Sequence, residues 1–336
     1  MSAMDAMGDP SSLALFWAGP IALAILVYVI LDGFDLGVGI LYGVQRDPTL
    51  RAQMMASISP FWDGNETWLV IVGASLFAAF PAVYAVFLPA FYLPVLLLLF
   101  GLIFRGVAFE FRFRGGPTWL WDAGFSVGSA IVAFVQGAAV GAMIGGLPVH
   151  DNQYAGGALT WLRPLSVICG LGLVAGYALL GAGWLVLKSE GRLRNWAYKA
   201  IPVVVVIVVP LLCLAGAGAL FELSVAQTPL GRRPWALIFP LLALAAIIGV
   251  FYGAASRRDY LPFVMTVLFF LAAFATLASL FWPYMIPYTI TIGNAAAPES
   301  SLSFLFWGAG IIALPIVAIY TCVVYWVFRG KHQPRY

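Results

Sequence analysis

The sequence predicts an all-α integral membrane protein with about nine transmembrane helices. Of its 336 residues, 63% are hydrophobic and only 9% are charged, whereas about 25% of the residues in an ordinary soluble domain are charged. The apolar runs reach about 20 residues, which is the length that crosses a bilayer as a helix. The strands of a β-barrel would be about half as long and would alternate apolar with polar residues. Composition and run length therefore both favour membrane-spanning helices.

Clusters of polar residues divide the chain into candidate spans. The first run is longer than a bilayer requires at about 1.5 Å per residue, so it tilts, extends beyond the bilayer or bends near Asp32 and Gly33. An odd number of spans would place the two termini on opposite sides of the membrane. The nine candidate spans lie near residues 13–43, 63–80, 82–104, 120–146, 163–187, 200–221, 234–254, 261–282 and 303–328.

The basic residues predict the orientation of these spans. If the N-terminus lies outside, only Arg163, Arg232 and Arg233 of the 17 basic residues fall in outer segments. This distribution agrees with the excess of Lys and Arg in cytoplasmic loops, and it places the C-terminus in the cytoplasm. The inner segments then contain Arg46, Arg51, Arg105, Arg112, Arg114, Lys188, Arg192, Arg194, Lys199, Arg257, Arg258, Arg329, Lys331 and Arg335.

The same topology divides the chain into four parts. Residues 1–12 form an extracytoplasmic segment with Asp5 and Asp9 but no Lys or Arg, unlike the basic start of a cleaved signal peptide. Residues 13–146 form a first four-helix bundle, and residues 147–328 form a second bundle with an additional helix. Residues 329–336 form a cytoplasmic tail. Connections this short leave no room for a soluble domain, so any chemistry is expected in the membrane or in a partner.

Glycines at four-residue spacing mark one face of the fourth span. Gly137, Gly141 and Gly145 clear that face so that another helix backbone can approach closely. We interpret this pattern as helix packing.

Acidic residues are concentrated in the first four spans. Placing an ionised carboxylate in the hydrocarbon region of a membrane costs a few kcal/mol, so such a group usually faces a cavity, pairs with a cation or is protonated. Arg105 is the nearest candidate cation, and Asp35 is expected to pair with it. Asp32 and Asp35 are three residues apart, as are Asp63 and Glu66. This spacing places the two acids of each pair on the same side of a helix. The acids expected to form a proton path or polar cavity are Asp32, Asp35, Asp63, Glu66, Glu110 and Asp122.

A structural role for some of these acids stays open. Asp63 follows Ser59 and Pro60, which suit the cap and first turn of a helix, where acidic side chains also favour the helix dipole. Glu110 and Asp122 equally fit helix ends that meet interfacial water. The aromatic and polar turn around Asp63 is nevertheless richer than a helix start requires, and it suggests a headgroup site or a contact between subunits.

Histidine is too scarce in this chain to bind haem within the membrane. The two histidines, His150 and His332, fall outside every candidate span, and the three cysteines lack metal-ligand spacing. We therefore expect no metal site and no haem ligated by this chain. The charge is dispersed over loops, so a nucleic-acid partner is excluded as well.

Several motifs in the first 125 residues, taken together, resemble subunit II of the cytochrome bd-type quinol oxidases, a family that includes the cyanide-insensitive oxidases. The resemblance continues through Phe104-Arg105, Glu110-Phe111-Arg112 and Trp121-Asp122, and weakens beyond them. The densest motifs are residues 32–39 (DGFDLGVG), 58–69 (ISPFWDGNETWL) and 76–84 (LFAAFPAVY).

This resemblance implies a subunit of a respiratory-chain terminal oxidase in a prokaryotic cytoplasmic (inner) membrane, with two four-helix bundles and one peripheral helix. It implies a heterodimer with a subunit I that holds haems b and d. The two subunits together would oxidise quinol and reduce dioxygen to water with protons from the cytoplasm. It also leaves room for a small single-helix subunit, membrane lipid and a bound ubiquinone. Carried over by motif, the quinone-binding residues would be Asp35, Trp62, Asp63, Arg105 and Asp122, and no residue of this chain would be catalytic.

Two other functions compete with this interpretation. A proton-coupled transporter could use the same carboxylates, but such sites often lie between two repeats, whereas here the acids cluster in one half. A purely structural scaffold without a proton role is the second alternative.

Overall fold

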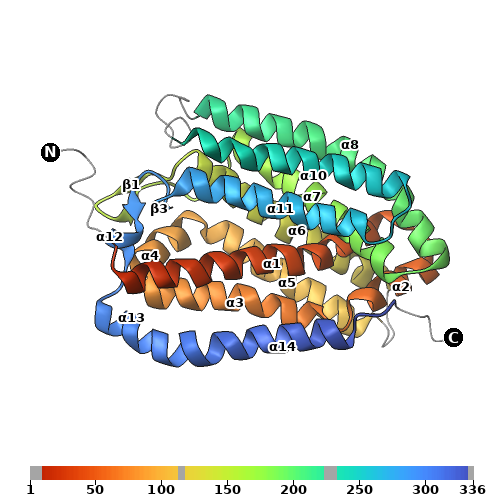
Figure 1. Cartoon of the computed structure of the whole chain (residues 1–336), viewed down its shortest axis with the longest axis horizontal. Coiled ribbons are helices and arrows are strands. Elements are labelled where there is room, and N and C mark those ends of the chain that lie inside the picture. Colours follow the sequence, from red (N-terminus) through yellow and green to blue (C-terminus); the bar gives the residue numbers. More distant parts are fainter. Residues whose placement is uncertain (1–9, 113–117, 223–232, 332–336) are drawn as a thin grey trace.

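The computed structural model describes residues 10–112, 118–222 and 233–331, and within them the chain is a bundle of long helices (Figure 1). The first part contains α1 (Ser12–Val44), α2 (Pro48–Ile58), α3 (Trp62–Ala79), α4 (Pro81–Ala90), α5 (Tyr92–Phe111) and α6 (Thr118–Ile144). The second part contains α7 (Pro164–Lys188), α8 (Gly191–Glu222), α10 (Ile238–Ala255), α11 (Leu261–Phe281) and α14 (Leu314–Val327).

Short elements connect or extend these helices. Two antiparallel pairs of strands, β1 (Val149–His150) with β2 (Gln153–Tyr154) and β3 (Tyr284–Ile286) with β4 (Ile290–Thr291), lie in connections. A 3-10 helix (Pro234–Leu237) precedes α10, and α12 (Ile292–Ala295) and α13 (Glu299–Leu305) precede a π-helical stretch (Phe306–Ala313) that continues into α14.

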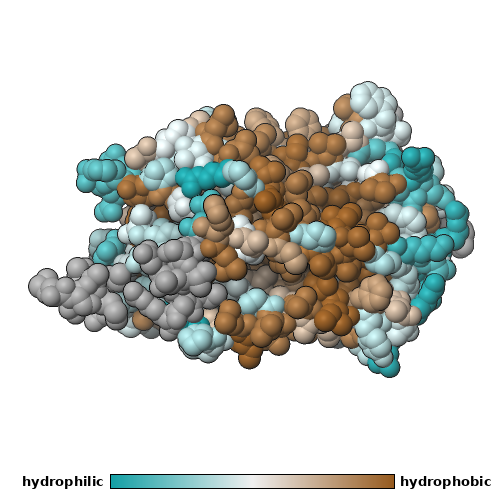
Figure 2. Space-filling view, turned by 90° about the horizontal axis from the view of Figure 1, so that it is seen from above, coloured by the Kyte–Doolittle hydropathy of each residue, from teal (hydrophilic) through white to brown (hydrophobic). Residues whose placement is uncertain are grey.

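The predicted class, an all-α membrane protein, is confirmed. Eight helices in the described ranges are long and apolar enough to cross a membrane, and apolar residues fill the middle of the face shown in Figure 2, with hydrophilic residues gathered at both ends. The helix α3 runs alongside α1 (Figure 1) but is not among the eight. Its first turns carry Asp63, Asn65 and Glu66, so the ninth span stays a prediction. The start of α1 and the end of α14 lie at opposite ends of the bundle (Figure 1), which is the arrangement that an odd number of spans would give.

The third predicted span is broken. The chain turns at Phe91, between α4 and α5, where the sequence had suggested one helix. Proline explains the break, because Pro94 has no amide hydrogen to donate to the carbonyl of Ala90 and its ring crowds that carbonyl.

A further helix, α2, occupies what the sequence suggested was only a connection. Asp47 caps it by accepting a hydrogen bond from the Thr49 amide at 2.9 Å, and Pro48 occupies its first turn. Both residues are typical of a helix start.

The helix α1 lies at the centre and packs against α3, α6 and α7. Its contact with α7 is close enough that a Cβ atom built on Gly37 would lie 1.8 Å from the Tyr177 carbonyl oxygen, and one built on Gly181 would lie 2.4 Å from the Gly37 carbonyl carbon. These two glycines therefore set the distance between the helices.

The glycine face predicted for the fourth span is also a packing surface. Cβ atoms on Gly137 and Gly141 of α6 would overlap the backbone of Cys169 and Ser166 in α7. One hydrophobic cluster accordingly includes buried residues of α1, α6, α7 and α11.

The last helix packs along the first part of the chain. Val317 and Ala318 contact the cluster around Trp68 of α3, and the Tyr325 hydroxyl donates to Asn65 Oδ1 at 3.0 Å. The π-helical stretch lies just before Pro315, whose missing amide hydrogen disfavours a regular α-helical turn there.

Candidate functional site

One buried arginine links three carboxylates from two helices. Arg105 of α5 donates through Nη1 to Asp32 of α1 at 2.9 Å and to Glu66 of α3 at 2.6 Å, and its Nη2 atom lies 3.8 Å from Asp35 Oδ2. The side chains of Asp32, Asp35 and Arg105 are at most 1% exposed, whereas that of Glu66 is 24% exposed. Glu66 is thus the member of this group that reaches the surface of the subunit.

The expected pairing of Asp35 with Arg105 is present, but Asp35 has a closer partner. The Asn65 side-chain amide donates to Asp35 Oδ2 at 2.7 Å and to the Leu31 carbonyl at 3.2 Å. Asn65 is 1% exposed, and it was not among the site residues expected from the sequence. The signal was its position one residue before Glu66, in a turn too polar for a lipid-facing helix. We call Asp32, Asp35, Asn65, Glu66 and Arg105 the Arg105 cluster.

Three buried atoms of the Arg105 cluster lack a hydrogen-bond partner among the described residues. They are Asp32 Oδ2, Asp35 Oδ1 and Arg105 Nη2. Unmet polar atoms in a buried polar site are typical positions for internal water, which binds where it finds two to four partners. The cluster therefore has the chemistry of a hydrated polar cavity rather than of a fully satisfied ion pair.

Asp63 and Glu110 do not join the Arg105 cluster. Asp63 is exposed in the first turn of α3, and Glu110 is exposed near the end of α5. Although Asp63 and Glu66 are only three residues apart in α3, Glu66 contacts Arg105 and Asp63 lies on the surface. Trp62, beside Asp63, is half-buried and stacks at a tilt on Phe109, with ring centroids 5.4 Å apart.

Asp122 belongs to a second charged group. Its carboxylate accepts from Arg112 Nε at 2.6 Å and from Arg51 Nη1 at 3.0 Å, and it also accepts a hydrogen bond from the Tyr42 hydroxyl. The Arg51 guanidinium lies 4.9 Å from the centre of the Tyr42 ring, within the range of a cation–π interaction. We call Tyr42, Arg51, Arg112 and Asp122 the Asp122 cluster.

Aromatic rings lie between the two clusters. Trp62 contacts Phe109, Phe109 contacts Phe125 at 6.1 Å between centroids, and Phe125 contacts Tyr42 at 5.1 Å. The five residues expected to hold a quinone are therefore divided among the buried Arg105 cluster, the surface at Trp62 and Asp63, and the Asp122 cluster.

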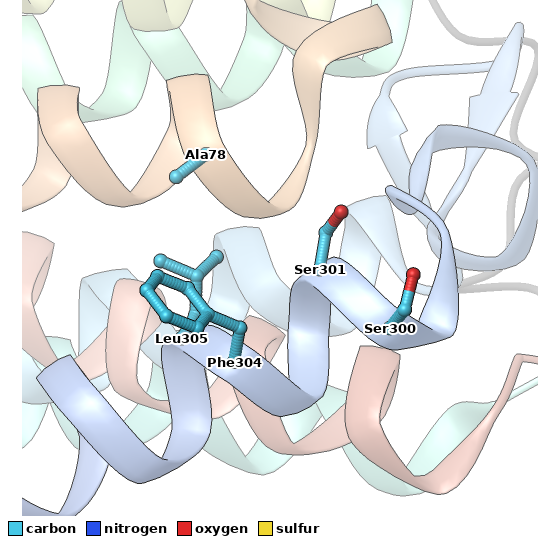
Figure 3. Close-up of a pocket in the computed structure, with 5 residues that line it drawn as sticks. All are labelled: Ala78, Ser300, Ser301, Phe304 and Leu305. Atoms are coloured by element: carbon cyan, nitrogen blue, oxygen red, sulfur yellow. The ribbon is translucent and has the colours of Figure 1, made fainter.

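The two pockets described lie away from the Arg105 cluster. A groove of about 370 Å³ between α3 and α13 is lined by Ala78, Ser300, Ser301, Phe304 and Leu305 (Figure 3). A second, of about 250 Å³, lies near Lys188, Phe328 and Lys331. Neither contains a carboxylate of the expected site.

Metal-ligating side chains do not gather in the described part of the chain. Within residues 10–112, 118–222 and 233–331, no group of three or more His, Cys, Asp or Glu side chains is placed to hold a metal ion. His150 is exposed in β1 beside Asp151. His332 lies outside the described residues, as do Asp5, Asp9, Arg114, Arg232 and Arg335.

Known proteins resemble this chain over nearly its whole length. A family model described as cytochrome bd terminal oxidase subunit II matches residues 13–328. Subunit 2 of the cytochrome bd-I ubiquinol oxidase of Escherichia coli is 28% identical, and the match covers 97% of this chain and 96% of that protein. Subunit 2 of the cytochrome bd ubiquinol oxidase of Bacillus subtilis is 30% identical, with 96% and 97% covered.

A solved structure shares the fold. The bd oxidase from Geobacillus thermodenitrificans matches with a TM-score of 0.73 at 14% identity, over 95% of this chain and 99% of the matched chain. The match at the level of sequence and the match at the level of fold agree with the motifs on α1 and α3. This chain belongs to the family of cytochrome bd terminal oxidase subunit II, and is therefore a component of a quinol oxidase.

Proposed function

We propose that this chain, paired with a haem-bearing subunit I in a cytoplasmic membrane, takes up protons from the cytoplasmic side through Glu66 and delivers them toward the site of dioxygen reduction in the partner. The observation that carries the proposal is the Arg105 cluster, in which three carboxylates surround one guanidinium. Ionising all three would leave excess negative charge in a region of low dielectric, so at least one is expected to hold a proton.

The difference in exposure among the three carboxylates supports a direction for proton movement through the Arg105 cluster. Glu66 is the partly exposed carboxylate, while Asp32 and Asp35 are sealed. A proton arriving at Glu66 can move inward to Asp35 along the unmet polar atoms beside Arg105. The Arg105 guanidinium stays protonated throughout. Its positive charge stabilises whichever carboxylate, Glu66 or Asp35, is ionised before or after the proton moves.

The loop charges support the proposed orientation. An excess of basic residues favours a cytoplasmic location for the end of the bundle where α14 ends: Arg46 lies between α1 and α2, Arg51 lies in α2, and Arg192 lies in the first turn of α8. Glu66 lies near the start of α3, four residues after Trp62. The entry is therefore on the cytoplasmic half of the subunit in this orientation.

We further propose that the chain supports assembly of subunit I, in which haems b and d would be held. Supporting this division of labour, His150 is exposed in a connection and the described residues contain no metal-ligand group. When bound there, the haems would supply the electron transfer and dioxygen chemistry. This chain's own contribution is the placement of protons and of the helices that the partner contacts.

A quinone role is proposed only for the surface around Trp62 and Asp63. Asp35 and Arg105 are buried, and Asp122 is held by Arg51 and Arg112. An indole ring and a carboxylate next to Glu66 offer a quinone a stacking face and a hydrogen-bond acceptor. The proton path does not require a quinone in this chain.

The transporter alternative is disfavoured by two observations. The buried acids lie in one group beside a single arginine rather than between repeats, and the relatives are oxidase subunits.

Proton uptake by the whole oxidase reconstituted in vesicles tests the proposal. Glu66→Gln should lower quinol-dependent oxygen consumption and the associated proton uptake by about tenfold or more, since it removes the entry carboxylate. Glu190→Gln is the matched control, because Glu190 is an exposed acid between α7 and α8, outside the cluster. Turnover of Glu66→Gln equal to that of the control, at equal haem content, would reject the proton role.

A further inference from the structure

A pocket of about 250 Å³, at the end of the bundle where α14 ends, contains a buried cation. It lies between α2, the end of α7 and the residues that follow α14, and Ala56, Phe61, Lys188, Phe328 and Lys331 are among the residues that line it. Lys188 is the last residue of α7 and is only 7% exposed. Lysine is almost never buried to this extent without an anionic partner, so we searched its surroundings for one.

Lys188 has hydrogen-bond acceptors but no carboxylate partner among the described residues. Its ammonium donates to the backbone carbonyls of Phe328 and Gly330, the latter at 3.2 Å. The ion pairs within residues 10–112, 118–222 and 233–331 include none with Lys188, and Glu190, two residues further on, is exposed. Because an ammonium has three donors, one is left for a ligand in the pocket.

Aromatic rings fix the position of this ammonium. Lys188 Nζ lies 5.1 Å from the centre of the Trp184 ring and 5.4 Å from that of Phe61, which is the range of a cation–π interaction. The Trp184 ring in turn stacks on Phe34, with centroids 3.9 Å apart. A lysine at a helix end usually extends its charge into water, whereas here packing directs the charge to the pocket wall.

Further basic groups make the surroundings of the pocket positive. Lys331 also lines the pocket and pairs with Asp259 at 2.7 Å, and Arg194 pairs with the same carboxylate at 3.2 Å. Among the described residues, Lys188, Lys331 and Arg194 therefore have one carboxylate between them within ion-pair distance. An anionic ligand in the pocket would balance part of this excess charge.

Exposed apolar side chains at the rim indicate which anion suits the pocket. Val327 and Phe328 line it and are 57% and 49% exposed, and Trp326 beside them is exposed as well. A soluble anion would leave this apolar surface uncovered, whereas a phospholipid brings a phosphate and acyl chains together. Basic pockets between membrane helices on the cytoplasmic side are typical sites for anionic lipid headgroups.

We propose that this pocket, which we call the Lys188 pocket, binds the phosphate of one anionic phospholipid. The remaining donor of Lys188 binds a phosphate oxygen, Lys331 adds positive charge, and the acyl chains lie against the exposed side chains at the end of α14. The inference is independent of the proposed proton path, because no residue of the Arg105 cluster lines the pocket.

Capping of α14 is the competing explanation for Lys188. A lysine near the end of a helix can donate to its last carbonyls, and that interaction alone stabilises the helix end. The variant Lys188→Gln separates the two roles, because its amide can still donate to a carbonyl but carries no charge to attract a phosphate.

Thermal unfolding of the assembled oxidase tests the proposal. The delipidated complex in detergent is titrated with dioleoylphosphatidylglycerol, with dioleoylphosphatidylcholine or with inorganic phosphate. Phosphatidylglycerol should raise the unfolding midpoint, since a ligand that binds the folded state stabilises it. Lys188→Gln should raise the phosphatidylglycerol concentration of half-maximal stabilisation by about fivefold. The matched control is Lys199→Gln, which removes the same charge from an exposed lysine of α8 and should leave that concentration unchanged.

Three results would overturn the proposal. Equal half-maximal concentrations for Lys188→Gln and Lys199→Gln would reduce Lys188 to a cap of α14. An equal response to phosphatidylcholine would show that the headgroup charge is not recognised. The same stabilisation by inorganic phosphate would assign the pocket to a soluble anion.

Two further variants keep the test available if Lys188→Gln fails to assemble. Ala56→Leu narrows the Lys188 pocket without changing any charge and should weaken the response to phosphatidylglycerol. Lys188→Arg keeps the charge and should preserve that response. An unchanged response of Ala56→Leu, or a lost response of Lys188→Arg in a complex that still assembles, would contradict a phosphate bound in this pocket.

Discussion

The side-chain amide of Asn65 donates to Asp35 at 2.7 Å, closer than the arginine that the sequence suggests as its partner. A neutral donor thus holds one carboxylate of the Arg105 cluster, while Arg105 itself is shared by Asp32 and Glu66. The cluster contains two kinds of carboxylate environment, one dominated by charge and the other by an amide.

Asn65→Leu should disturb Asp35 without removing a charge. The variant leaves a buried carboxylate oxygen without its donor, which costs about 1–3 kcal/mol, and it also removes the acceptor of Tyr325. We expect oxygen consumption to fall while the assembled complex is still recovered. Tyr325→Phe is the control, since it removes only the hydrogen bond to Asn65 Oδ1. Equal turnover of the two variants would show that the contact with Asp35 is unimportant.

Arg105→Met should prevent or severely reduce assembly. It removes the cation from the three carboxylates, and breaking a buried ion pair by deleting one partner costs about 3–5 kcal/mol. Yield and the thermal unfolding midpoint of the complex are the measurements. The double variant Arg105→Met with Asp32→Asn should recover part of the loss, because it leaves fewer buried acids unpaired. A double variant worse than the sum of the two single variants would contradict this account.

Gly37→Ala should abolish the close contact of α1 with α7. Its methyl group would overlap the Tyr177 carbonyl, at 1.8 Å, whereas the methyl group of Gly19→Ala in the same helix meets nothing within 4 Å. Since Ala favours a helix over Gly by about 1 kcal/mol where there is space, Gly19→Ala should leave the unfolding midpoint unchanged or raised. Folded yields that are the same for the two variants would show that the helices separate at little cost.

Asp259, in the connection between α10 and α11, should make stability depend on pH. Partial burial acts to raise the pKa of this carboxyl, but hydrogen bonds from Lys331 at 2.7 Å and Tyr198 at 2.8 Å, with Arg194 nearby, hold the pKa below its usual range. A lowered pKa contributes stability above the unfolded-state value, about 3.9, and that stability is lost as the pH falls through the folded-state value.

The corresponding variant is Asp259→Asn. It should lower the thermal unfolding midpoint at neutral pH, and the difference from the unchanged protein should shrink as the pH falls below about 4. A difference that stays constant down to acidic pH would mean that the carboxylate charge is not what stabilises this connection.

The features that can be predicted from the sequence are those that depend on residues within one helix or one loop. Run length and loop charge indicate the spans, and the glycine spacing of α6 indicates its packing face, because both are properties of consecutive residues. The pairing of Arg105 with acids of α1 also follows, since a buried carboxylate needs a cation and few are available in the first part of the chain.

Contacts between distant helices could not be predicted in the same way. Spacing of three residues places Asp63 and Glu66 on one side of α3, yet Glu66 pairs with Arg105 while Asp63 is exposed. Asp122 pairs with Arg51 of α2, in a segment for which the sequence predicted a connection and not a helix. Gln136 of α6 accepts a hydrogen bond from Tyr177 and donates one to Tyr28, which lie 41 and 108 residues away.

The polarity of α3 has a consequence for how the protein is made. A segment that carries Asp63, Asn65 and Glu66 at its start falls outside the helices apolar enough to cross a bilayer by themselves. During synthesis it would partition poorly into lipid until α1 and α5 are both present to neutralise and hydrogen-bond its polar side chains. Arg105 is synthesised after Glu66. The segment of α3 would therefore stay at the membrane surface or in the insertion machinery until α5, which carries Arg105, has been synthesised. The residues proposed to carry protons in the mature subunit would thereby also set the order in which its first helices enter the bilayer.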